Sequence, residues 1–120
     1  MAAQGGIVIA VIFELWAAEP ERYFALAAGL HDELVKVDGF LSIERFRSVS
    51  APDKFVSLSF WRDEIAVAAW RTTEQHRDAQ AAGRGGVLRD YRLRVAAVLR
   101  DYGMAERDEV PADSLAVHDG

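Results

Sequence analysis

Two tryptophans and one histidine lie close together in the sequence, on segments expected to form a strand and the helix that follows it. Trp61 ends an apolar run, and Trp70 and His76 follow in a helix-like pattern. An imidazole titrates near neutral pH, so it can take a proton from a phenol or from a carbon next to a carbonyl. The electron-rich anion made in this way can pass an electron to dioxygen without a metal or a flavin. His76 is therefore a candidate catalytic base and Trp70 its catalytic neighbour, in a pocket for a small aromatic or quinol-like molecule.

Other aromatic, histidine and amide side chains are candidate walls of that pocket. The candidate substrate-binding residues are Trp16, Tyr23, Phe24, His31, Trp61 and Gln80. On a helical wheel at about 100° per residue, His76 shares one arc with Ile65 and Gln80, which aims it toward the sheet. The alternative for each tryptophan or histidine is that it only fills the core.

Glu14 is the one charged residue in an apolar segment that spans residues 6–16. If its side chain faces the helices, burial raises its pKa and makes it a candidate base. If it faces a partner subunit, it pairs with an arginine such as Arg45, Arg47 or Arg94. Both alternatives stay open at this point.

Composition excludes several other kinds of chemistry. The 120 residues contain no cysteine, so a disulfide, a thiolate metal site and a cysteine nucleophile are impossible. The three histidines, His118 among them, lack the spacing of a metal site, and no Gly-x-Gly-x-x-Gly or P-loop pattern occurs. A net charge of -5 argues against binding to nucleic acid or a membrane surface. We expect no metal, no nucleic acid, no membrane and a cytoplasmic location.

The elements that must position these residues alternate between strand and helix patterns. Pro20 suits the first turn of a helix, Gly39 suits the end of one, and Asp63 suits the cap of the next. We predict strands over residues 6–16, 40–49, 55–61 and 91–102, and helices over 20–38 and 64–80. This order is the ferredoxin-like β-α-β-β-α-β pattern, an α+β fold with an antiparallel sheet.

The strands look apolar on both faces, whereas both helices of such a fold cover only one. The uncovered face therefore predicts a homodimer joined through its sheet faces. Residues 1–103 are expected to form one domain and residues 104–120 a C-terminal tail. The tail is acidic and contains Pro111. It is either loose or an arm across the partner subunit, anchored by Val110 and Leu115.

Three segments carry a resemblance to a known family: residues 60–64 (FWRDE), residues 69–71 (AWR) followed by His76, and residues 91–95 (YRLRV). In their order and spacing they resemble the antibiotic biosynthesis monooxygenase family, which consists of dimeric α+β barrel proteins. The resemblance covers about residues 6–103. It implies a ligand pocket between sheet and helices, and oxygenation of phenols, anthrones or quinols by dioxygen with no cofactor. Two other functions stay open: a dimer that only binds a small ligand, and an isomerase-like proton-transfer enzyme.

The same superfamily includes haem-degrading enzymes, which use an asparagine on the first strand, a tryptophan on the second helix and a later histidine iron ligand. Trp70 matches the tryptophan, but the chain contains no asparagine. Ala79 or Gln80 stands where the iron ligand would fall, roughly two to three turns after the tryptophan. We therefore do not expect haem degradation.

Overall fold

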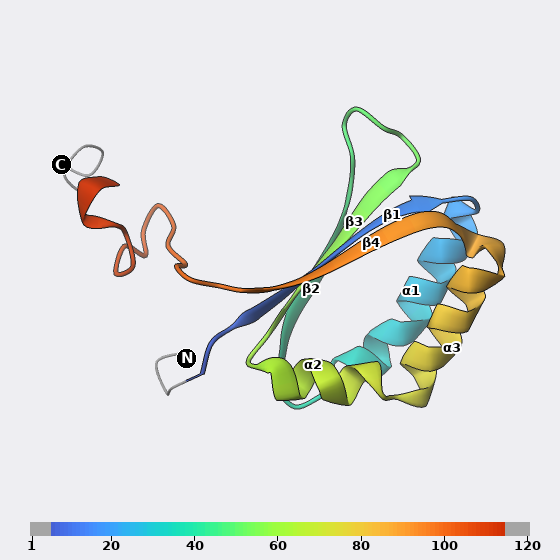
Figure 1. Cartoon of the computed structure of the whole chain (residues 1–120), viewed down its shortest axis with the longest axis horizontal. Helices are drawn as coiled ribbons and strands as arrows, with labels where there is room; N and C mark the ends of the chain where they lie inside the picture. The colour runs from blue at the N-terminus through green and yellow to red at the C-terminus, as the bar shows by residue number, and fades with distance from the viewer. Residues whose placement is uncertain (1–5, 115–120) are drawn as a thin grey trace.

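The computed structural model describes residues 6–114 of the chain, apart from the side chains of residues 74, 75 and 83. Figure 1 shows a twisted sheet with the helices gathered on one side of it. The elements are β1 (Ile9–Ala17), α1 (Pro20–Leu34), β2 (Phe40–Arg47), β3 (Lys54–Trp61), α2 (Glu64–Arg71), α3 (Glu74–Ala82) and β4 (Leu88–Ala97). An irregular turn, Gly83–Val87, joins α3 to β4.

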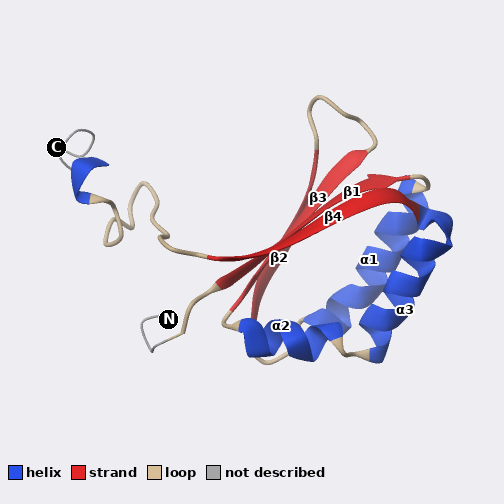
Figure 2. Cartoon of the chain, viewed as in Figure 1, coloured by secondary structure: helices blue, strands red, loops and turns tan. Residues whose placement is uncertain are grey.

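The four strands pair in the order β2-β3-β1-β4, and every neighbouring pair is antiparallel. Helix α1 connects β1 to β2, and α2 and α3 connect β3 to β4 across the same face (Figure 2). The ferredoxin-like fold expected from the sequence is thereby confirmed. No helix within residues 6–114 is long and apolar enough to cross a membrane.

Two separate clusters of buried residues lie between the sheet and the helices. The first comprises Ile9, Leu34, Trp61, Ala66 and Val67. The second comprises Leu15, Ala17, Tyr23, Phe55 and Val87. Ile9 pairs with Trp61 and Leu15 with Phe55, so the two clusters lie toward opposite ends of the sheet. Because side chains alternate along a strand, the odd-numbered residues of β1 and β3 face the helices and the even-numbered ones face away.

The predicted bounds of the last strand are wrong at both ends. Strand β4 runs over Leu88–Ala97, whereas residues 91–102 were expected. Ala97 pairs with Ile9, the first residue of β1. Strand β4 therefore ends where its partner strand begins. Residues 98–114 continue away from the helices (Figure 1). Whether the tail meets a partner subunit stays a prediction, and Leu115 and His118 lie outside the described residues.

Candidate active site

Helix α2 is held in place at its first turn. Asp63 caps it, as predicted, because its Oδ1 accepts the Ala66 N–H at 2.9 Å. The Arg62 N–H donates to the Gly39 carbonyl at 2.7 Å, and the Arg62 guanidinium donates to both carboxylate oxygens of Asp38 at 3.1 and 3.2 Å. The turn before β2 and the start of α2 are therefore tied together, which sets the direction in which α2 leaves the sheet.

The single helix predicted over residues 64–80 is in fact two helices, α2 and α3. The hydroxyl of Thr73 donates to the Trp70 carbonyl at 2.9 Å, and its oxygen accepts the His76 N–H at 3.1 Å. One side chain thus bonds to the end of α2 and caps α3. The wheel drawn through one continuous helix is wrong for the same reason: Ile65 is 78% exposed.

Trp70 and His76 nevertheless lie against each other at the junction of α2 and α3. Their ring centroids are 5.3 Å apart, with the planes tilted by 59°. The indole also packs on the first core cluster. Nδ1 of His76 lies 3.3 Å from the Arg71 carbonyl oxygen. Because a carbonyl oxygen only accepts, Nδ1 carries the hydrogen in this contact and Nε2 keeps its lone pair.

The imidazole of His76 is kept in its neutral form. Burial lowers the pKa of His76, the hydrogen bond to the Arg71 carbonyl opposes that effect, and the charges of Arg71 and Arg77 lower the pKa further. A lowered pKa leaves the neutral imidazole as the main form at pH 7, where it accepts protons.

Two rows of side chains cross the helix-facing side of the sheet between the two core clusters, and we call them the central floor. From β2 to β4, one row is Ile43, Ser59, Val11 and Val95, and the other is Arg45, Ser57, Phe13 and Leu93. Ser57 and Ser59 are small and buried, whereas Leu93 and Val95 are 50% and 46% exposed although their face of the sheet meets the helices. A half-exposed apolar surface of this kind suits a small apolar ligand.

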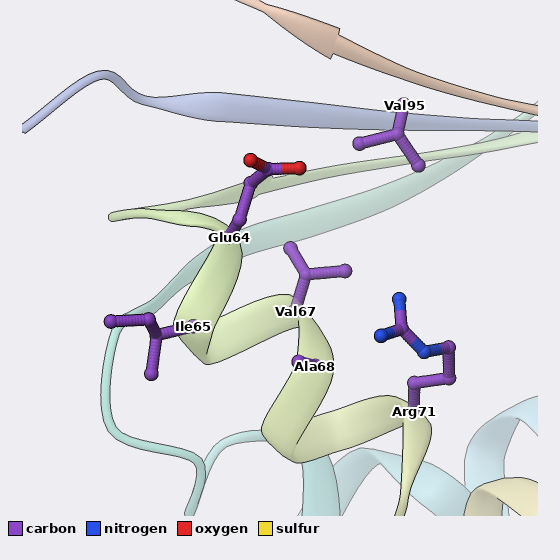
Figure 3. A pocket seen from close by; sticks show the side chains of 6 residues that line it. All are labelled: Glu64, Ile65, Val67, Ala68, Arg71 and Val95. Atoms are coloured by element: carbon purple, nitrogen blue, oxygen red, sulfur yellow. The ribbon is translucent and has the colours of Figure 1, made fainter.

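A pocket of about 350 Å³ lies at the β4 edge of this floor, between α2 and Val95. Figure 3 shows Glu64, Val67 and Arg71 pointing from α2 toward the strands, while Ile65 points away. The pocket therefore combines an apolar base with one carboxylate and one guanidinium. Trp70 and His76 do not line this pocket, and Arg71 links them to it, because its side chain lines the pocket and its carbonyl bonds to His76.

Three of the predicted aromatic residues line the helix-facing side of the sheet. Trp61 is 2% exposed, and its indole N–H donates to the Ser59 hydroxyl at 2.9 Å. Tyr23 is buried, and its ring centroid lies 6.3 Å from that of Phe55. Phe24 is 41% exposed and meets Phe55 edge to face at 5.0 Å. Trp61 and Tyr23 thus belong to the two core clusters, and Phe24 is open to a ligand.

Trp16 and Glu14 lie on the opposite face, away from the helices. Trp16 stacks under the Lys54 ammonium at 4.9 Å. Glu14 accepts from Arg94 at 2.8 Å and pairs with Lys54 at 3.6 Å. The hydrogen bond from Arg94 is the main cause of a lowered Glu14 pKa, against a smaller opposing effect of burial. Of the two alternatives for Glu14, the structure shows the arginine pair.

His31 and Gln80 are exposed on α1 and α3, so the structure does not bring them to the central floor. Among the side chains that the structure describes, no group of three or more His, Cys, Asp or Glu could hold a metal ion. Ser57, Ser59 and Arg71 were not among the predicted site residues, and Arg45 was predicted only as a possible partner of Glu14. The alternation of β3 showed that Ser57 and Ser59 share a face but not that this face meets the helices, and nothing local marked Arg71.

Comparison with known proteins gives a match of residues 8–82 to the family model described as antibiotic biosynthesis monooxygenase. A curated protein of Pyricularia oryzae named jasmonate monooxygenase ABM is 46% identical over 93 residues. That alignment covers 76% of this chain and 43% of the fungal protein, so the chain spans less than half of this relative.

Solved structures share the fold at low sequence identity. SnoaB, a cofactor-independent oxygenase from Streptomyces nogalater, superposes with a TM-score of 0.69 at 14% identity, over 80% of this chain and 96% of that one. A protein from Mycobacterium tuberculosis superposes with a TM-score of 0.63 at 22% identity, over 80% of this chain and 99% of that one.

Proposed function

Because the chain belongs to the antibiotic biosynthesis monooxygenase family, we propose that it is a cofactor-independent monooxygenase of a small aromatic, quinol or polyketide-like substrate. The substrate lies over the central floor, between the sheet and the helices, with dioxygen as the second substrate. The fungal relative's name points in the same direction, since it describes a monooxygenase.

One observation carries the proposal: the neutral imidazole of His76 lies against Trp70 and bonds to the carbonyl of Arg71, whose side chain lines the pocket along α2. His76 bonds through Nδ1–H to a backbone carbonyl, so Nε2 is the atom that takes the substrate's proton. Trp70 supplies an apolar ring that keeps water from the imidazole and offers a face to an aromatic substrate.

The chemistry needs no external reductant when the substrate supplies both electrons. Removal of a proton from an activated CH₂ group leaves an electron-rich anion, which transfers an electron to dioxygen. Recombination and loss of water then turn the CH₂ group into a carbonyl, with one oxygen atom in the product and the other in the water. The protein's part is to accept the first proton and to hold the substrate in an apolar place.

Oxygen uptake by the metal-free and haem-free protein tests this directly, with a panel of hydroquinones, naphthols and anthrones, and jasmonate included because of the relative's name. We expect uptake that depends on both protein and substrate. His76→Gln should lower kcat by about 10²–10⁴-fold, the usual contribution of a general base. His31→Gln is the matched control, since His31 is exposed on α1, and should keep the activity.

Three results separate the alternatives. Product formation without oxygen points to a proton-transfer enzyme, and tight ligand binding without turnover points to a binding protein. Turnover that survives His76→Gln unchanged contradicts the assignment of the base.

We also propose that the protein is a homodimer joined through the sheet face that lacks helices. Apolar side chains of β1 and β3 form the centre of that face: Ala10, Ile12, Val56, Leu58 and Phe60. Light scattering should give twice 13.3 kDa. Leu58→Arg should give a monomer, whereas Val49→Arg, at a fully exposed site in the β2–β3 loop, should not. A wild-type monomer contradicts this proposal.

A further inference from the structure

A second pocket lies at the opposite edge of the central floor, between α1 and the strands β2 and β3. It measures about 290 Å³, and its lining residues are Phe24, Arg45, Phe46, Arg47 and Phe55. The rings of Phe24 and Phe55 and two guanidinium groups surround it, whereas the side chain of Phe46 faces the other side of the sheet, and none of its lining residues carries a carboxylate. It differs in this respect from the pocket of Figure 3, where Glu64 accompanies Arg71.

Arg45 is incompletely satisfied. Its Nε atom is shielded from solvent and has no hydrogen-bond acceptor. Arg45 takes part in no ion pair with any side chain that the structure describes: the carboxylate partners belong to Arg22, Lys36, Lys54, Arg62, Arg89 and Arg94. Glu44, the next residue along β2, faces the other side of the sheet.

The groups around Arg45 do not neutralise it. The Tyr23 phenol oxygen accepts a hydrogen bond from Arg45, and burial raises the Tyr23 pKa more than the charge and the hydrogen bond of Arg45 lower it. The phenol therefore stays uncharged at neutral pH. Arg47, on the same face two residues on, lies over the Phe55 ring at 5.5 Å and adds a second positive charge.

A half-buried guanidinium with no anion beside it is costly, and a carboxylate relieves that cost because its two oxygens match the planar fork of arginine. In the row of the central floor that contains Arg45, the next side chain is Ser57, followed by the apolar side chains of Phe13 and Leu93. A ligand with a carboxylate at one end and an apolar body at the other matches this order of groups.

We infer that the substrate is a small apolar carboxylate, whose anionic end is held by Arg45, with Arg47 at the pocket rim. This inference rests on the proposed function, because it names the substrate class of the same site. Phe24 and Phe55 flank the carboxylate end, and the reacting end extends along the floor toward β4.

Calorimetric titration of the full chain with 2-naphthoate, and with 2-naphthamide as its neutral isostere, tests the inference without turnover. The wild type should prefer the carboxylate by about ten- to hundredfold, as expected for a charge-assisted hydrogen bond. Arg45→Gln should abolish the preference and leave amide binding as it is. Arg45→Lys, which keeps the charge without the fork, should retain a part of it, and Arg84→Gln, in the exposed turn before β4, should retain all of it.

Equal affinity for both probes in the wild type, or a full preference in Arg45→Gln, overturns the inference. Thermal unfolding of each variant shows whether a change in affinity is caused by misfolding. If Arg45→Gln is misfolded, the carboxylate preference of Arg45→Lys decides instead. A carboxylate preference in a protein that takes up no oxygen supports the inference while the proposed function fails. If the protein takes up oxygen only with neutral substrates and shows no carboxylate preference, the inference fails and the proposed function stands.

Discussion

Replacement of Gly39 by alanine should destabilise the protein far more than the same replacement at Gly29. Gly39 has φ of +93°, a conformation that residues with a side chain rarely adopt. A Cβ placed there would lie 2.7 Å from the Ala66 Cβ and 3.2 Å from Nη2 of Arg62. Gly29 lies inside α1, and a Cβ there would meet nothing within 4 Å.

The two substitutions therefore add the same methyl group with opposite effects. Adoption of a left-handed conformation costs about 1–3 kcal/mol, and the contact with the Ala66 Cβ adds about 1–3 kcal/mol because α2 has to move. We expect Gly39→Ala to lose about 2–6 kcal/mol of unfolding free energy. Gly29→Ala should gain about 0.5–1 kcal/mol, since alanine favours a helix more than glycine does.

Urea unfolding followed by circular dichroism gives both numbers, with tryptophan fluorescence as a second probe of two-state behaviour. Thermal unfolding should separate the two variants by roughly 10 °C or more for a chain of this size. If Gly39→Ala lies within about 0.5 kcal/mol of wild type, the close approach of this turn to α2 is refuted, and with it our account of how α2 is positioned.

Three further predictions concern the core and the candidate base. Leu15→Ala should cost about 2–5 kcal/mol in urea unfolding, because Leu15 is fully buried. Ser59→Ala should cost about 1–3 kcal/mol in the same assay, since it leaves the buried indole N–H of Trp61 without its acceptor. His76 has a folded-state pKa below its ordinary value of about 6.5, so its neutral form stabilises the fold above that pH, and stability should fall as the pH drops below it. Melting temperatures from pH 8 to 5 should therefore fall more for wild type than for His76→Gln, and parallel curves contradict the lowered pKa.

The order and type of the elements were predictable because they depend on local pattern. Alternating apolar residues indicated the strands, Pro20 began a helix and Asp63 capped another. The break between α2 and α3 was not predictable from a helical wheel. It depends on the hydroxyl of Thr73, which can either face solvent or replace backbone bonds, and local sequence does not decide between them.

The candidate site, like the fold, was predictable from the sequence only in part. Trp70 and His76 were predicted to lie together and do so, although through a turn and not through one helix. Trp16 and Trp61 were both predicted to line the pocket, but they lie on opposite faces of the sheet. Which face of an apolar strand meets the helices depends on the packing of α1 and α2, and alternation alone leaves both choices equal.

By itself the sequence determined the fold class, the family resemblance and the residue types available for chemistry, because these follow from composition, spacing and short-range pattern. Only the tertiary structure decided which of those residues share a surface. The register of β1, β2 and β3 put Arg45, Ser57 and Phe13 in one row, although more than thirty positions separate Phe13 from Arg45. Burial then left the Nε atom of Arg45 without an acceptor and kept His76 neutral. Such effects arise from side chains distant in sequence that exclude water together, so they exist only once the chain has folded.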